Sequence, residues 1–337
     1  MAVRILTCNF VSMPGSSRDC LPNTSAKGSN GRPLKRHQQL KLAPETGTFA
    51  HLPKDLLELV ELFRSYSATD PRDKIYAILG LASALETDRL ASRIDADYGL
   101  HAKGLFLEFA RLVISGPDAL RLLRNVHGSR EQSSNLPSWV PDWSISLKIR
   151  PLAELCKPAY LLPSQRAILL KQPSLDVLKL VGKRIDTIKA VGEVLSESSG
   201  EASLQIWNSW MSLGRKHGLT PPEAFNWDAF SIPQDYRGFR EFQEYSYLQT
   251  KIPKHCSEIC FGRRYLLTKQ SRSGLVPAGA KVGDEIILFP GAELPFVVGQ
   301  DKSDNMFYIV GECYLDRVFL DSLMQEKVYK RGVYYLK

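Results

Sequence analysis

The chain has 337 residues, of which 44% are hydrophobic and 24% charged, which is typical of a globular protein with enough apolar residues for a core. No run of 18 or more apolar residues occurs, so we expect no membrane span. The formal net charge is +8, but residues 1–41 hold seven basic residues and one acid, so the remaining chain carries only +2. Binding of nucleic acid is therefore expected only through residues 1–41.

The N-terminal segment, residues 1–50, lacks hydrophobic periodicity and is rich in Gly, Ser, Asn, Pro and basic residues. This composition predicts a disordered basic tail. The six cysteines form no dense framework and no secretion signal accompanies them, so we expect reduced thiols and a cytoplasmic protein. A mitochondrial or a nuclear location is left open by the basic, acid-poor tail.

The first ordered element is expected from about Pro53, where apolar residues from Leu56 to Phe63 recur at helical spacing. A second helix should start at Asp70, whose carboxylate can cap the free N–H groups of the first turn. Pro71 would then occupy the first helical position and Asp73 the third. Ile75, Ile78, Leu79 and Ala82 supply its buried face. We expect the two helices to pack as a hairpin.

Two further helices are predicted, over residues 100–115 and 118–123, separated by Gly116-Pro117. Asp95 and Asp97, which precede them, have the character of turn residues rather than of a catalytic pair. The stretch from Leu136 to Ser144 holds two prolines and is predicted to be irregular. Its tryptophans, Trp139 and Trp143, should be buried. We also expect Arg72 and Asp73 to make a structural polar contact that bridges the helix start to this loop.

In the centre of the chain, the spacing of the apolar residues changes from that of a helix to that of a strand. Residues 177–181 and 185–191 suggest two strands joined by a turn at Gly182-Lys183-Arg184. A helix is predicted over residues 201–217, with positive charge in its last turn and Gly218 as its stop. Thr220 to Glu223 has the pattern of a capping box. The aromatic residues between Tyr236 and Tyr247 fit core packing better than base stacking.

The C-terminal quarter is predicted to be β-rich, with Gly274, Gly279, Gly283-Asp284, Pro290-Gly291 and Asp304-Asn305 in turns. Candidate strands are 263–268, 285–289, 295–298, 306–311 and 328–336. We therefore predict an α+β fold with a helical N-terminal half, a mixed centre and a C-terminal antiparallel β-sheet or small barrel. The expected divisions are 1–50, the basic tail; 51–150, helical with the tryptophan loop; 151–255, mixed; and 256–337, β-rich.

Candidate chemistry is sparse. His255, Cys256 and Cys260 are the most metal-like cluster, but a closed zinc site needs a fourth ligand and only Cys313 follows, so buried cysteines are the better interpretation. No nucleophile elbow, no triad and no phosphate-binding loop can be recognised. We expect no catalytic residue, no metal and no cofactor, and hence no enzyme.

Several motifs, in matching order and spacing, together resemble fungal heterokaryon-incompatibility (HET) domain proteins. They are Thr69-Asp70-Pro71-Arg72-Asp73-Lys74-Ile75-Tyr76-Ala77-Ile78-Leu79-Gly80-Leu81, Asp97-Tyr98 with residues 106–111, Leu136-Pro137-Ser138-Trp139-Val140-Pro141-Asp142-Trp143-Ser144, Gly262-Arg263-Arg264-Tyr265, Gly283-Asp284, Pro295-Phe296-Val297 and Val310-Gly311-Glu312-Cys313-Tyr314. The resemblance covers roughly residues 50–335 and corresponds to the region that follows the HET module in that family.

The family's HET module, which is similar to TIR domains and is associated with cell-death signalling, has two motifs that do not occur in this sequence. The resemblance therefore implies a truncated paralogue, a degenerate copy or an incomplete gene model. We expect a non-enzymatic accessory or regulatory module that acts through contacts with protein partners in fungal non-self recognition or programmed cell death. The alternatives are a fragment of a HET/TIR-like NAD-cleaving effector and, more weakly, nucleic-acid binding by the basic tail.

Overall fold

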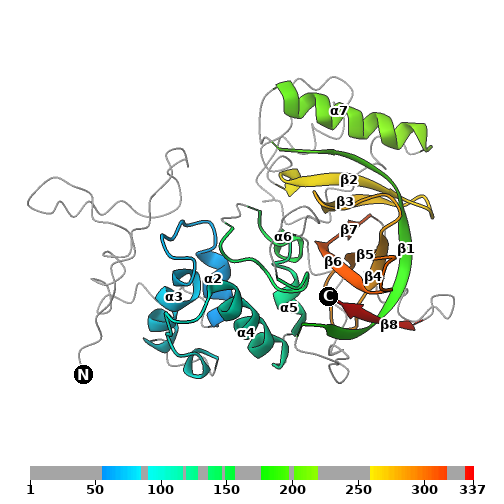
Figure 1. The fold of residues 1–337 in the computed structure, drawn as a ribbon. Coiled ribbons are helices and arrows are strands. Elements are labelled where there is room, and N and C mark those ends of the chain that lie inside the picture. The colour runs from blue at the N-terminus through cyan, green and yellow to red at the C-terminus, as the bar shows by residue number, and fades with distance from the viewer. Residues whose placement is uncertain are drawn as a thin grey trace, which may run out of the picture. The chain divides into compact units, whose positions relative to one another are not determined.

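The computed structural model describes residues 55–84, 90–116, 119–127, 136–145, 149–155, 176–196, 201–218, 259–316 and 331–337 (Figure 1). These residues form two compact units, one from the described parts of 1–105 and 143–148 and the other from those of 106–142 and 149–337. The predicted basic tail, the Thr220 capping box, the aromatic region 236–247 and His255-Cys256 lie outside the described residues. The predicted domain boundaries stay a prediction.

The first unit is helical. Its elements are α2 (Leu56–Leu62), α3 (Asp73–Ala84), η2 (Ala91–Arg93) and the start of α4 (Ala102–Ile114). Asp55 caps α2, since its Oδ1 accepts hydrogen bonds from the N–H groups of Leu57 at 2.7 Å and Glu58 at 3.3 Å. Helices α2 and α3 contact each other, as the predicted hairpin requires.

Helix α3 begins three residues later than the predicted cap. The N–H of Asp73 donates to the carbonyl of Asp70 at 3.0 Å, which closes a turn over residues 70–73, and the Oδ1 of Asp70 accepts from the N–H of Arg72 at 3.0 Å. The carbonyl of Arg72 then accepts the first i to i+4 hydrogen bond, from Tyr76 at 2.9 Å. Asp70 therefore caps the turn that leads into the helix rather than the helix itself.

The second unit contains the remainder of α4, the helices α5 (Ala119–Leu123), α6 (Leu152–Leu155) and α7 (Glu201–Lys216), and an eight-stranded sheet. The strands are β1 (Leu178–Val194), β2 (Arg263–Thr268), β3 (Ser273–Pro277), β4 (Glu285–Leu288), β5 (Phe296–Gln300), β6 (Phe307–Glu312), β7 (Tyr314–Leu315) and β8 (Arg331–Leu336). The predicted α+β class is confirmed, and β3 and β7 are strands that the sequence pattern missed.

The long strand β1 organises the sheet (Figure 1). Its first part pairs with β8, its middle with β4 and its last part with β2, all antiparallel. Because β4, β5, β6 and β8 also pair in that order, five strands close into a ring, while β2, β3 and β7 extend the sheet beyond it. Within the ring, β6 and β8 are parallel and share the single register pair Phe307 and Leu336.

The predicted strand, turn and strand over residues 177–191 is wrong, because β1 runs without interruption through Gly182-Lys183-Arg184. Glycine is needed at 182 for close approach, since a Cβ there would lie 2.6 Å from Cγ2 of Ile287. Gly274 is similarly not a turn residue: it lies in β3, where a Cβ would meet the carbonyl oxygen of Tyr314 at 1.8 Å. Both glycines mark places where chains lie close together.

Two apolar clusters of described residues lie in the core of the second unit. One is built from side chains of β1 to β7, including Ile185, Ile286 and Val310. The other lies under α7, where Trp210 stacks on Tyr265 with ring centroids 6.2 Å apart. The Nε1 of Trp210 donates to the carbonyl of Glu193 at 2.9 Å.

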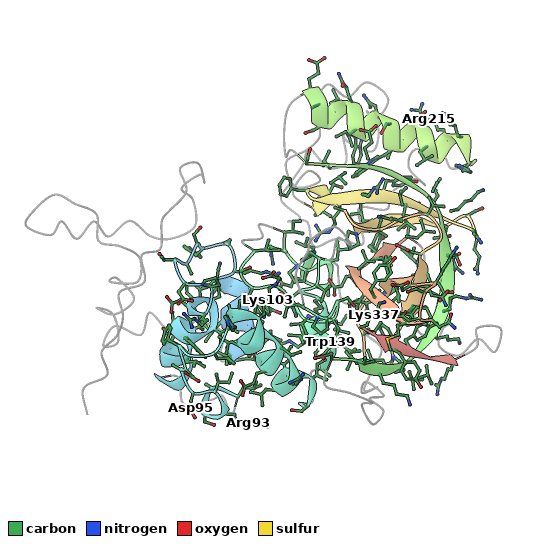
Figure 2. All side chains as sticks on the ribbon, in the orientation of Figure 1. Arg93, Asp95, Lys103, Trp139, Arg215 and Lys337 are labelled. Carbon is green, nitrogen blue, oxygen red and sulfur yellow. The ribbon has the colours of Figure 1, made fainter. Side chains whose placement is uncertain are left out.

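Helix α7 agrees with its prediction. Arg215 and Lys216 lie in its last turn (Figure 2), and Gly218 follows with a φ of +81°. None of the helices within the described ranges is long and apolar enough to cross a membrane.

Candidate functional site

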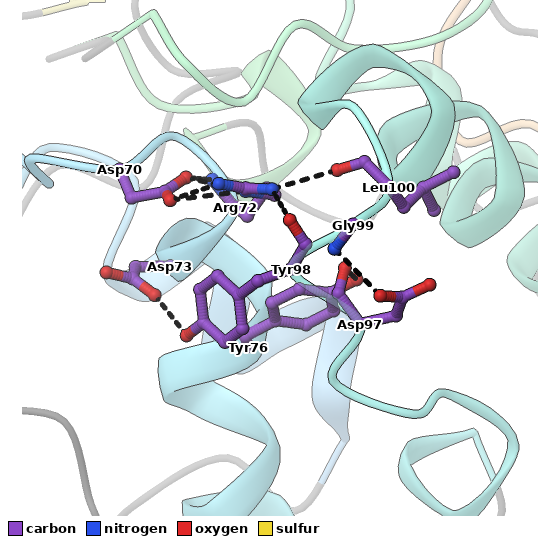
Figure 3. Close-up of polar contacts among 8 residues, drawn as sticks. All are labelled: Asp70, Arg72, Asp73, Tyr76, Asp97, Tyr98, Gly99 and Leu100. Atoms are coloured by element: carbon purple, nitrogen blue, oxygen red, sulfur yellow. Dashed lines mark hydrogen bonds and ion pairs between the residues drawn. The ribbon is translucent and has the colours of Figure 1, made fainter.

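The start of α3 is the best-defined polar cluster of the first unit (Figure 3). The guanidinium of Arg72 forms an ion pair with Asp70 at 2.6 Å and donates to the carbonyl oxygens of Tyr98 and, at 3.1 Å, Leu100. It also lies over the Tyr98 ring, 5.1 Å from the centroid. Arg72 thus makes the expected structural contact, but with segment 98–100. Among the described residues its hydrogen bonds do not reach the tryptophan loop.

The neighbouring polar groups also connect α3 to residues 97–100 by hydrogen bonds (Figure 3). The hydroxyl of Tyr98 donates to Oδ1 of Asp73 at 2.7 Å, and that of Tyr76 donates to the carbonyl of Asp97 at 2.9 Å. The Asp97 carboxylate accepts from the N–H of Gly99 at 2.7 Å, which agrees with its predicted role in a turn. The hydrogen bond from Arg72 lowers the pKa of Asp70. The cluster is therefore a clasp between α3 and residues 97–100.

Lys74, on the same helix, is buried and forms hydrogen bonds with the segment that follows α2. Its Nζ donates to the carbonyl of Arg64 at 2.9 Å and to that of Tyr66. Burial lowers the pKa of Lys74 to about 8. The Arg64 guanidinium lies 4.8 Å from the ring centroid of Trp143, which is fully buried as predicted. Lys74 and Arg64 thus link α3 and the end of α2 to this tryptophan.

The other part of the tryptophan motif belongs to the second unit. Trp139 is buried, and its Nε1 donates to the carbonyl of Asp176 at 3.0 Å, just before β1. Its neighbour Ser138 lies between the end of β8 and β6. The Ser138 N–H donates to the backbone carbonyl of Lys337 at 2.8 Å, and the Ser138 Oγ accepts from the N–H of Ile309 at 3.1 Å. This loop therefore completes the ring where β6 and β8 barely pair. Pro141 is buried and Asp142 is half-buried.

Glu312 is the most strongly buried acid of the motifs. Its Oε2 accepts from the N–H of Ala153 at 3.2 Å, and its Oε1 lies 3.9 Å from Nε of Arg124. Arg124 also forms an ion pair with Glu293 at 2.5 Å, so its charge is shared. Burial raises the pKa of Glu312 to about 7, against the opposing effects of Arg124 and Arg263. Two predicted motif residues, Arg263 and Glu312, are therefore brought to one polar cluster.

The adjacent arginines of the Gly-Arg-Arg-Tyr motif are both structural donors. Arg263 donates to the carbonyl of Ile259 at 2.6 Å and to that of Arg150. Arg264 donates to the carbonyls of Gly192 at 2.6 Å and Ala280 at 3.1 Å, and burial lowers its pKa. Guanidinium groups suit this task because they present several donors in a fixed plane.

The remaining motif residues have backbone or packing roles. Gly311 has a φ of +142°, and a Cβ on it would lie 2.6 Å from the carbonyl oxygen of Val126. Gly283 lies in the turn before β4, and Asp284 accepts from the N–H of Lys281 at 2.9 Å. Gly262 donates its N–H to the carbonyl of Leu195 at 2.8 Å, and Tyr314 is buried in the core cluster under α7.

The described residues form neither a metal-binding site nor a reactive thiol site. No group of three His, Cys, Asp or Glu side chains there is suited to hold a metal ion. Cys260 and Cys313 are buried and form no disulfide within the described residues, and burial raises the pKa of Cys313 well above its ordinary value. A buried thiol of this kind is a poor nucleophile. Cys256 and His255 are outside the described residues, so the predicted absence of a zinc site stays a prediction.

Sequence reasoning missed Arg124, Ser138 and Lys74. Ser138 lies inside a recognised motif, but its hydrogen-bond partner, Ile309 of β6, is distant in sequence and meets Ser138 only in the fold. Arg124 follows α5 and carries no local signal, because its acidic partners lie in the C-terminal region. A buried Lys74 could have been suspected from its position among Asp73, Ile75 and Tyr76 on a largely buried turn of helix.

The chain is similar to fungal heterokaryon-incompatibility proteins. The family model of the Het-6 beta-barrel domain matches residues 248–336, which include β2 to β8. Heterokaryon incompatibility protein 6, OR allele, of Neurospora crassa is 22% identical over 352 aligned positions, which cover 79% of this chain and 51% of that protein. The chain thus spans about half the length of this curated relative. No solved structure matches it.

Proposed function

We propose that this chain is a non-enzymatic accessory or regulatory module of a heterokaryon-incompatibility system, which acts through protein–protein contacts. The relationship to Heterokaryon incompatibility protein 6 supports the system. The observation that carries the non-enzymatic role is the internal use of the motif residues. Arg72, Arg263 and Arg264 all direct their guanidinium groups to backbone carbonyls of the chain itself.

A substrate-binding arginine would instead be expected to present donors to a cleft, where they could meet a carboxylate or a phosphate. The tryptophans of the third motif likewise lie in the core, and the two described cysteines, Cys260 and Cys313, are buried. We infer that these motifs preserve a scaffold, and that the function is carried by surfaces of that scaffold. Programmed cell death and fungal non-self recognition are the processes in which we place it, with a cytoplasmic location. The location is supported by Cys260 and Cys313, the two described cysteines, which form no disulfide within the described residues.

Two measurements test this proposal. The purified full chain should consume NAD no faster than the heat-denatured chain, whereas sustained turnover would make it a fragment of a HET/TIR-like effector. Expression in one of two otherwise isogenic Neurospora crassa strains should change the growth of the heterokaryon that they form. An unchanged heterokaryon, with the folded chain present in the cells, would contradict the proposed system.

A further inference from the structure

The outward face of the β1–β8 ladder exposes apolar side chains in register. In these two antiparallel strands Val181 lies opposite Val333, and Lys179 lies opposite Tyr335. Val333 is 44% exposed and Tyr335 is 36% exposed. Both are among the large apolar side chains most exposed in the described part of the chain, and they lie two residues apart on one strand. We call Lys179, Val181, Arg331, Val333 and Tyr335 the ladder face.

Alternation along β8 explains why these side chains share a face. Tyr334 and Leu336 point into the ring and are buried, so Arg331, Val333 and Tyr335 must point outward. The same rule places Lys179 and Val181 of β1 beside them, since Leu178 and Leu180 are buried, whereas Lys183, opposite Arg331, is buried and ends the exposed part of β1. Exposed apolar groups that cluster in this way are typical of binding surfaces, whereas single exposed residues need no explanation.

The charged side chains of the ladder face itself, Lys179 and Arg331, are positive. Arg331 is exposed at one end, and the Nζ of Lys179 lies 5.1 Å from the ring centroid of Tyr335 at the other. Farther along the same strand face, Lys337 (Figure 2) forms ion pairs with Asp301 at 2.7 Å and Asp304 at 2.6 Å, so those two acids are already neutralised in part. An apolar centre with a cation at each end is complementary to an apolar segment flanked by carboxylates.

We propose that the ladder face docks an extended segment of a partner protein, in which aliphatic or aromatic side chains are flanked by Asp or Glu. This inference rests on the proposed function, because it names a surface and a partner chemistry for the protein contacts. The apolar side chains of the segment would cover Val181, Val333 and Tyr335, and its carboxylates would meet Arg331 and Lys179. A nucleic acid fits less well, since its phosphates would leave the central valines without apolar partners.

Selection of short random peptides displayed on phage against the full chain tests this proposal. We expect enriched peptides to combine aliphatic or aromatic residues with Asp or Glu. Synthetic copies should bind Val333→Asp and Arg331→Glu at least about tenfold more weakly than the original chain, since each substitution places a carboxylate against an apolar or acidic part of the segment. Tenfold corresponds to about 1.4 kcal/mol. Circular dichroism and thermal unfolding establish that each variant is folded.

Matched controls lie elsewhere on the same unit. Val282→Asp alters a valine that is 63% exposed in the turn before β4, and Lys216→Glu reverses an exposed charge on α7, so neither should change peptide binding. Peptides that bind all variants equally, or a preference for basic peptides or single-stranded RNA, would overturn the proposal. So would self-association of the chain that Val333→Asp abolishes, since the occupant would then be a second copy. Tight peptides that map to another surface would refute the ladder face but leave the protein-contact function standing.

Discussion

The Oγ of Ser138 accepts a hydrogen bond from the N–H of Ile309 at 3.1 Å, and so joins a loop of the tryptophan motif to β6. Ser138→Ala removes this acceptor and leaves the Ile309 N–H without it. We expect a loss of about 1 kcal/mol in the free energy of unfolding, the usual contribution of one hydrogen bond. Hydrogen exchange should show faster exchange at the Ile309 amide, while exchange at Trp210 on α7 serves as the internal control. Unchanged protection at Ile309 would show that the hydrogen bond is dispensable.

Gly311→Ala should be strongly destabilising. Its φ of +142° disfavours any L side chain, and the new Cβ would lie 2.6 Å from the carbonyl oxygen of Val126. We expect a loss of about 2 kcal/mol or more, measured by urea unfolding. Gly332→Ala in β8 is the matched control, because its Cβ would find its nearest atom at 3.6 Å. Equal stability of the two variants would contradict the close approach at Gly311.

Arg72→Ala should loosen the clasp between α3 and residues 97–100. It removes the donors to the carbonyls of Tyr98 and Leu100 and the ion pair with Asp70. We expect a lower unfolding temperature, because two backbone carbonyls lose a charged hydrogen-bond donor. Arg93→Ala, at an exposed position of η2, should cost less than about 0.5 kcal/mol in the same thermal unfolding experiment. A variant as stable as the original chain would mean that Arg72 is not needed to hold this segment.

Glu312→Gln should change how stability depends on pH. Burial raises the pKa of Glu312 from 4.5 to about 7, so the folded chain keeps a proton that the unfolded chain releases between these values. The free energy of unfolding should therefore fall as pH rises through this window, by up to about 3 kcal/mol from this group. Gln cannot ionise, so its curve should lack this fall. Parallel curves for the two proteins, from urea unfolding between pH 4 and 8, would show that Glu312 does not titrate there.

Local signals in the sequence predicted most helices. Helical spacing of apolar residues located α2, α3 and α4, and Gly218 ended α7 as expected. The start of α3 was displaced because Asp70 hydrogen-bonds within a turn, and a carboxylate can cap a turn as well as a helix. The local pattern therefore fixed where helices occur better than where they begin.

The sheet was predicted less well than the helices, because its contacts join residues that are distant in sequence. Gly182 and Gly274 were assigned to turns because glycine favours them, yet both lie in strands where neighbouring groups would collide with a Cβ. Which neighbouring strand approaches a glycine depends on strand pairing, and strand pairing is not encoded in the local sequence. The Arg124, Glu293 and Glu312 cluster was missed for the same reason, because its members meet only after α5 and the C-terminal strands have come together.

The sharing of β1 among three partners sets an order on folding. Residues 178–194 emerge from the ribosome well before β4, and β8, at residues 331–336, is synthesised after the other two partners of β1. During synthesis the edge of β1 that later receives β8 is therefore an open strand edge, and such edges attract unwanted pairing. Because its contacts are distant in sequence, ring closure should be a slow, late step of folding. The chain's vulnerability to aggregation should thus be greatest in the interval between the appearance of β1 and that of its last partner.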